Sequence, residues 1–155
     1  MKILMVCLGN ICRSPLAEGI LKQKALMAGL HWYIESAGTN NFNIGVPPHH
    51  FSKKVAHLNG IDINNKRSRG FRPDDFESFD KIYGMSEDVM SEMKFIAGNK
   101  FNEDKVCLLM DELYPGKNRE VPDPWYGTEP DFHSVYKLID AACDKIIEKY
   151  ATPGY

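Results

Sequence analysis

One stretch constrains this chain more than any other: the octapeptide CLGNICRS, from Cys7 to Ser14, followed at once by Pro15. A short apolar run, residues 2–6, precedes it, and a helical pattern begins behind it. A strand therefore feeds a small loop that opens a helix. Backbone N–H groups of such a loop can converge on one point, which the positive end of the helix also faces. The stretch predicts a site for an anion.

Three side chains of this loop suit phosphoryl transfer. The field of the loop should stabilise Cys7 as a thiolate nucleophile, and Ser14 can donate to its sulfur. Arg13 can hold two oxygens of a phosphoryl group with its planar fork. The Cys-x5-Arg spacing alone is a weak signal, but the strand before it and the helix after it exclude a merely buried cysteine beside a surface arginine. The predicted phosphate-binding residues are Leu8, Gly9, Asn10, Ile11, Cys12, Arg13 and Ser14.

Strand and helix patterns alternate along the chain. Strands are predicted over residues 2–7, 32–35, 81–85 and 106–110, with helices over residues 15–28, 49–59 and 87–98 and a last one opening at Thr128. Ser86 is expected to cap the third of these helices, and Thr128 with Asp131 to form a capping box at the last. This order predicts an α/β fold, a three-layer αβα sandwich on a four-stranded parallel sheet, in a single domain of residues 1–155. Residues 152–155 are expected to be a frayed tail. Cys7 and Asp123 follow the first and fourth strands and should share one sheet edge.

The composition excludes several function classes. With 43% apolar and 26% charged residues and a net charge of −2, the chain shows no sign of a nucleic-acid or membrane partner. Four cysteines without a secretory signal suggest reduced thiols, and hence a cytoplasmic location. Cys7 and Cys12 have no second ligand pair, and the adjacent His49 and His50 suit a tetrahedral site poorly. We therefore expect no metal and no cofactor, and a monomer.

Displacing an alcohol from a phosphate monoester also requires a proton for the leaving oxygen. The group that donates it must lie on a loop that reaches the anion site. Asp123 is a candidate after the fourth strand, and Pro124 restricts its backbone, although an Asp-Pro pair by itself usually indicates only a turn. Asp111, Glu112 and Glu120 share that loop and remain alternatives.

Two other segments are open to more than one interpretation. Phe42 is the one large aromatic residue in the loop over residues 36–48. It could lie at the rim of the site or at the edge of the core. The basic stretch of residues 64–72 is interpreted as a solvated face, although it could also attract an anionic substrate.

The octapeptide, with Pro15, Ala17 and Glu18 behind it and Asp123-Pro124 late in the chain, resembles the signature of the low-molecular-weight protein tyrosine phosphatases over essentially the whole sequence. The resemblance implies a flavodoxin-like fold and hydrolysis of phosphotyrosine through a phosphocysteine at Cys7. Asp123 would protonate the leaving tyrosine oxygen and then activate water. The implied partners are a phosphotyrosine-containing protein as substrate and inorganic phosphate or other oxyanions as competing ligands.

The resemblance assigns further roles. Asn10 would hold the loop by bonding Ser36, and Ile11 matches tyrosine-directed rather than arginine-directed members. Cys12 matches a cysteine that forms a reversible disulfide with Cys7. Ser86 departs from the aspartate that many members carry there. The implied substrate wall is made of Phe42, Trp125 and Tyr126.

Two alternatives use the same loop. An arsenate reductase needs resolving cysteines near the first, whereas Cys107 and Cys143 fall in a predicted strand and a predicted helix. A non-catalytic phosphotyrosine-binding module needs only Arg13 and the loop, whereas this chain also has Cys7 and Asp123.

Overall fold

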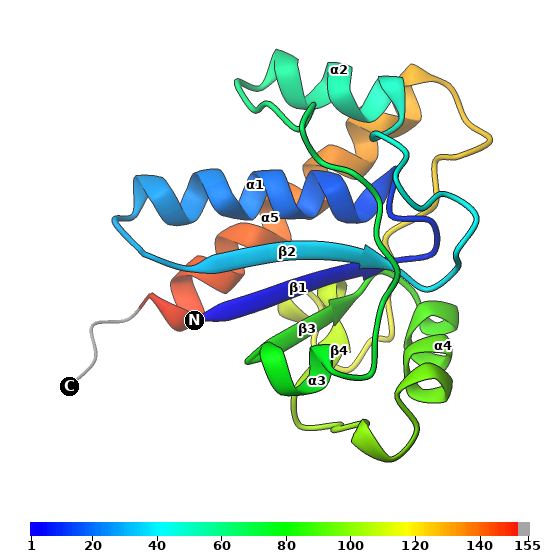
Figure 1. Ribbon diagram of the computed structural model, residues 1–155. Helices are drawn as coiled ribbons and strands as arrows, with labels where there is room; N and C mark the ends of the chain where they lie inside the picture. The colour runs from blue at the N-terminus through cyan, green and yellow to red at the C-terminus, as the bar shows by residue number, and fades with distance from the viewer. Residues whose placement is uncertain (152–155) are drawn as a thin grey trace.

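The computed structural model describes residues 1–151 as a parallel sheet covered by helices on both faces (Figure 1). The four strands lie in the order β2-β1-β3-β4, and all three pairings are parallel. The predicted α/β sandwich is confirmed. The expected frayed tail, residues 152–155, lies outside the described residues. None of the described helices is long and apolar enough to span a membrane.

The strands are short, and β1 is central. Their bounds are β1 Lys2–Cys7, β2 Tyr33–Gly38, β3 Lys81–Gly84 and β4 Val106–Leu108. β2 runs three residues beyond its predicted end, because all six of its residues pair with β1, from Lys2 with Tyr33 to Cys7 with Gly38. β4 ends two residues early, and a 3-10 turn, η2 (Leu109–Glu112), follows it.

The helices are α1 Arg13–Met27, α2 His50–Leu58, α3 Asp75–Ser78, α4 Glu87–Ala97 and α5 Glu129–Tyr150, with a 3-10 turn, η1, at Gly98–Lys100. Local capping explains two of the starts. The Ser86 side chain accepts from the Val89 N–H at the start of α4, and Thr128 and Asp131 form a capping box at α5. Both caps were predicted.

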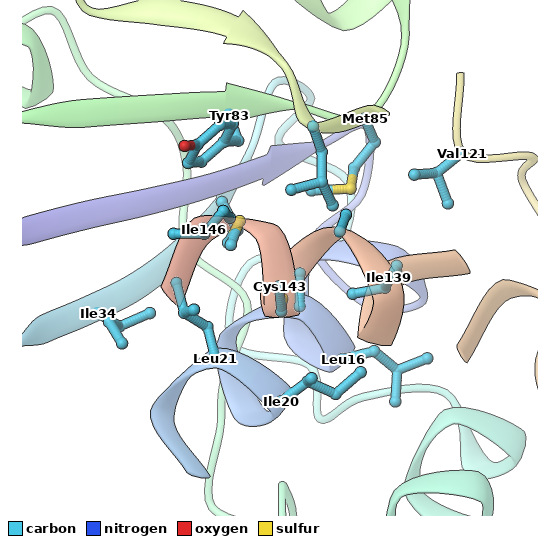
Figure 2. Packing of buried hydrophobic residues seen from close by; sticks show 14 of the residues in the cluster. Leu16, Ile20, Leu21, Ile34, Tyr83, Met85, Val121, Ile139, Cys143 and Ile146 are labelled. Carbon is cyan, nitrogen blue, oxygen red and sulfur yellow. The ribbon is translucent and has the colours of Figure 1, made fainter. Parts of the chain in front are cut away.

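The core has two parts, one on each face of the sheet. Alternate residues of β1 point to opposite faces, so Ile3 and Met5 pack beneath α1 and α5, while Leu4 and Val6 face α3 and α4. Figure 2 shows side chains of α5, among them Ile139 and Ile146, meeting α1 and the sheet in the larger cluster. With a neighbour on either side and a cluster on either face, β1 holds its last residue, Cys7, in a rigid setting.

The loops that follow β1 and β2 lie together at the carboxyl edge of the sheet (Figure 1). The Thr39 and Asn40 N–H groups donate to the Cys7 and Leu8 carbonyls at 3.0 Å, which continues the β1–β2 ladder past the strands. Gly38 lies so close to this turn that a Cβ there would meet the Leu8 carbonyl oxygen at 2.9 Å. The sheet thus fixes the base of the predicted anion site.

Candidate active site

A cavity of about 360 Å³ opens at this edge of the sheet. Cys7 and Arg13 lie at its base, and Asp123 reaches it from the segment of residues 121–128. Its other lining residues are Leu8, Gly9, Ile11, Cys12, Asn40, Phe42, Asn43, Trp125 and Tyr126. Sequence positions more than 100 residues apart are thus brought to one place, as the parallel topology predicts.

The loop between β1 and α1 closes around the Cys7 sulfur. The Asn10 N–H donates to this sulfur at 3.2 Å, and the Ser14 hydroxyl oxygen lies 2.9 Å from it. Asn10 has a φ of 57°, in the left-handed region that asparagine tolerates better than most residues. α1 begins at Arg13, so the positive end of its dipole faces the same turn. Such surroundings favour negative charge on the sulfur.

Asn10 is the hub of the hydrogen bonds behind the loop. Its side-chain N–H₂ donates to the Ser14 and Ser36 hydroxyls at 2.8 Å and 2.9 Å. Its side-chain oxygen accepts from the Arg69 N–H at 3.1 Å. Asn10, Ser14 and Ser36 are all fully buried. Ser36 therefore does not line the cavity, but supports the loop from behind.

The network continues into the region read from the sequence as a solvated face, and that interpretation is wrong for two of its residues. Ser36 donates to the buried carboxylate of Glu18 at 2.7 Å. The Lys66 ammonium donates to the Ser36 carbonyl at 2.7 Å and lies 3.3 Å from Glu18. Arg69 forms a two-pronged pair with Asp75 at 3.1 Å. The cause is the Gly38–Gly70 bridge, which draws this stretch against β2.

Arg13 is the buried cation of the cavity, with 4% of its surface exposed. Its Nη1 donates to the Val121 carbonyl at 3.0 Å, and its Nη2 lies 3.7 Å from the Asp123 carboxylate. Its Nε is buried without a hydrogen-bond partner. An anion in the cavity could accept from this N–H, which meets the requirement that buried donors be satisfied.

The four acidic candidates for the proton donor separate clearly in space. Asp123 lines the cavity beside Cys7. Asp111 and Glu112 line a different cavity, together with Lys81 and Cys107. Glu120 accepts from the Glu87 N–H at 2.7 Å, at the start of α4. Of these four carboxylates, Asp123 is the one in the position that the predicted chemistry requires.

The predicted wall residues surround the mouth of the cavity. Phe42 is 91% exposed, so it is at the rim and not at the edge of the core. Tyr126 is 97% exposed and Trp125 45% exposed. Ser86 lies in a neighbouring groove with Arg13 and Asp123, and it caps α4. The segment is attached beside the start of α4 through Glu120, which accepts from the Glu87 N–H, and through Val121, whose N–H donates to the Met85 carbonyl at 2.9 Å.

The remaining cysteines are free in the structure, as are Cys7 and Cys12. Burial, followed by the charges of Cys7 and Asp123, raises the pKa of Cys12 to about 12. Cys107 is in β4 and Cys143 is buried in α5, and neither lines the cavity. Cys107 and Cys143 therefore do not lie where an arsenate reductase needs its resolving cysteines.

Sequence reasoning missed Glu18 and Lys66 as supports of the loop, and His49 as a neighbour of the wall. Lys66 gave no sign of its partners, because Ser36 and Glu18 lie 30 or more residues away along the chain. His49 was considered only as a metal ligand, although its position directly before a helix signals a cap.

A Cys-x5-Arg loop between a parallel strand and a helix, with a carboxylate facing it across one cavity, defines a cysteine-type phosphatase. The model of the family "Low molecular weight phosphotyrosine protein phosphatase" matches residues 2–152. The chain belongs to this family.

Relatives and solved structures agree with this assignment. The chicken low molecular weight phosphotyrosine protein phosphatase is 36% identical over 153 residues, covering 95% of this chain and 94% of its own. A crystal structure of a protein tyrosine phosphatase from Entamoeba histolytica is 35% identical with a TM-score of 0.88, covering 97% of each chain. Wzb from Vibrio vulnificus, in complex with benzylphosphonate, is 28% identical with a TM-score of 0.85, covering 96% of this chain and 97% of its own.

Proposed function

We propose that this protein hydrolyses phosphotyrosine in protein substrates, with Cys7 as nucleophile, Arg13 as phosphate clamp and Asp123 as general acid and base. The observation that carries the proposal is the meeting of these three residues in one cavity. The benzylphosphonate complex of Wzb supports an aryl phosphate as substrate, since benzylphosphonate places an aromatic ring beside a phosphonate.

In the first step, the Cys7 thiolate attacks phosphorus and the bond to the tyrosine oxygen breaks. The proton of Asp123 passes to that oxygen, so tyrosine leaves as a neutral phenol. Arg13 and the loop N–H groups stabilise the equatorial oxygens in the transition state. Ser14, at 2.9 Å from the sulfur, steadies the thiolate by hydrogen bonding. The product of this step is a phosphocysteine and an ionised Asp123.

In the second step, water attacks the phosphocysteine and gives its proton to Asp123. The sulfur leaves as a thiolate, for which Ser14 again serves as donor, and inorganic phosphate is released. Each group that these steps require is a side chain or backbone N–H of this chain. We therefore expect turnover without an added metal, and competitive inhibition by inorganic phosphate and other oxyanions.

The rim supports selection of aromatic phosphate esters. Phe42, Trp125 and Tyr126 surround the mouth, and the Cys7 sulfur lies at the base of a cavity with only 2% of Cys7 exposed. A long, flat phosphotyrosine can reach this depth while its ring contacts the wall. Phosphoserine carries its phosphorus too close to its backbone to do the same. Ile11, as in tyrosine-directed members, fits this preference.

The test is hydrolysis of p-nitrophenyl phosphate in excess chelator by the wild type and by Cys7→Ser. We expect steady turnover by the wild type and a loss of at least about a thousandfold in the serine variant, because removal of a nucleophile costs on this order. The variant should still bind phosphate. Full activity of Cys7→Ser, or loss of wild-type activity in chelator, would overturn the mechanism. Tight phosphate binding without any turnover would favour the binding module.

A further inference from the structure

His49 joins three parts of the molecule at the rim of the cavity. Its backbone N–H donates to the Ile11 carbonyl at 2.8 Å, so the start of α2 is attached to the phosphate-binding loop. Its Nδ1 accepts from the Phe51 N–H at 3.1 Å and caps α2. Its ring makes an edge contact with Trp125, with 5.7 Å between centroids and an interplanar angle of 76°.

The ring of His49 also packs against two other rings. It stacks on Phe132 of α5 at 4.7 Å and 25°, and on His50 at 4.5 Å and 21°. Phe132 is fully buried and packs with Ile11 and Cys12 of the phosphate-binding loop. The imidazole therefore presents to Trp125 a surface that is fixed relative to the base of the cavity.

Trp125 belongs to a compact turn that also carries the proposed acid. Its N–H donates to the Asp123 carboxylate at 3.1 Å, and the Gly127 N–H donates to the Pro124 carbonyl at 2.8 Å. The aromatic wall and the carboxylate are thus parts of one small unit, residues 123–127. A contact that fixes Trp125 also restrains Asp123.

We propose that His49, as a neutral imidazole, is a positioning residue that holds Trp125 and the 123–127 turn against the rim of the cavity. Its effect on turnover rests on the proposed function, whereas the contact with Trp125 can be measured without any substrate. Through its contact with Trp125, His49 would take part in substrate selection, although the phosphate chemistry itself does not use it.

The neutral form follows from the geometry. Because Nδ1 accepts from Phe51, the neutral ring carries its proton on Nε2, and a second proton on Nδ1 would face a donor. Burial and then the charge of His50 lower the pKa of His49 below its ordinary value of 6.5. Ionisable groups on the elements around His49 include Cys12 of the loop, Arg13 at the start of α1, His50, Lys53, Lys54 and His57 of α2, Asp123 and Tyr126 of the turn, and Glu129, Asp131, His133 and Tyr136 of α5.

The test uses a Trp32→Phe parent, in which Trp125 is the single remaining tryptophan. Emission of Trp125 should fall below pH 6.5, because an imidazolium in contact with an indole quenches it. His49→Phe keeps an aromatic ring and should abolish this titration while leaving the emission maximum unchanged. His49→Asn keeps an N-cap acceptor but removes the ring, so it should shift the emission to the red and increase quenching by acrylamide.

Kinetics give the second measurement. His49→Asn should raise KM for phenyl phosphate about twofold to tenfold, the effect of losing one aromatic contact, and leave KM for a small alkyl phosphate unchanged. His49→Phe should restore the wild-type ratio of the two. His57→Asn is the matched control, because His57 is an exposed histidine of α2, the helix that His49 caps.

Two results would overturn the proposal. One is an unchanged Trp125 emission and an unchanged aryl-to-alkyl ratio in His49→Asn. The other, which decides the matter even if that variant fails to fold, is a Trp125 titration that persists in His49→Phe. Absence of turnover in the wild type would instead refute the proposed function, and the fluorescence results would still judge the contact.

Discussion

The Nη2 of Arg13 lies 3.7 Å from the Oδ2 of Asp123, and both residues line the cavity. The arginine side chain is 5% exposed and the aspartate side chain 43%, so a buried cation faces a carboxylate that water can reach. An ion pair of this exposure contributes little to stability. The pair instead fixes the position of Asp123, because it links the segment after β4 to the loop after β1.

Replacement of Asp123 by Asn should slow the hydrolysis of phenyl phosphate about a hundredfold to ten-thousandfold, the usual contribution of a general acid. The loss with p-nitrophenyl phosphate should be smaller, because p-nitrophenolate leaves without a proton. Rates of both substrates from pH 4 to 8 measure the effect. Glu120→Gln is the matched control and should retain most activity. Equal losses for both leaving groups would contradict a role for Asp123 in protonation.

Replacement of Asn10 by Ala should lower the free energy of unfolding by about 2–4 kcal/mol. The variant loses two buried hydrogen bonds and one partly buried one, and places alanine at a φ of 57°. Ser36→Ala removes one of these contacts and should cost less, about 1–2 kcal/mol. Urea unfolding of the two variants provides the comparison. If Asn10→Ala lowers the free energy of unfolding no more than Ser36→Ala does, Asn10 is not the centre of this hydrogen-bond network.

Replacement of Lys66 by Met should destabilise the protein by about 1–3 kcal/mol, since the buried Glu18 and the Ser36 carbonyl each lose a charged donor. Arg72→Met, in the same basic stretch but exposed, should change stability by less than about 0.5 kcal/mol. Thermal unfolding distinguishes the two. Similar effects would restore the interpretation of this stretch as a solvated face.

The Cys12 thiol should resist alkylation at pH 8, because its pKa is raised to about 12 by burial. Iodoacetamide should modify Cys7 first, and phosphate should protect it; peptide mass spectrometry identifies the labelled sites. The raised pKa also means that the unfolded state ionises first as the pH rises above 9. The stability that the buried, neutral Cys12 thiol contributes is therefore fully present below pH 9 and is lost progressively towards pH 12. Labelling of Cys12 as fast as of Cys7 would refute this account.

Local patterns predicted most of the fold, because each relied on neighbouring residues: the apolar run of β1, the Ser86 cap and the Thr128 capping box. The end of β2 could not be predicted this way, since it depends on pairing with β1 and on the approach of Gly70 to Gly38. The partners of Lys66 are equally remote in sequence. For the site, Cys7 and Arg13 stood out by their spacing, whereas the choice of Asp123 over Glu120 leaned on the family resemblance.

The two sides of the cavity are attached very differently. Phe42 belongs to the loop that continues the β1–β2 ladder through Thr39 and Asn40, and so it is carried on the same backbone framework as Cys7. Asp123 and Trp125 are joined to the rest through side-chain contacts with Arg13 and His49. One wall of the cavity is thus continuous with the sheet, whereas the other wall, residues 123–127, is held by side-chain contacts that follow Val121, whose N–H donates to the Met85 carbonyl at 2.9 Å. Because this second wall does not share the backbone framework of Cys7, sequence changes in residues 123–127 would alter contacts with the substrate without disturbing the nucleophile.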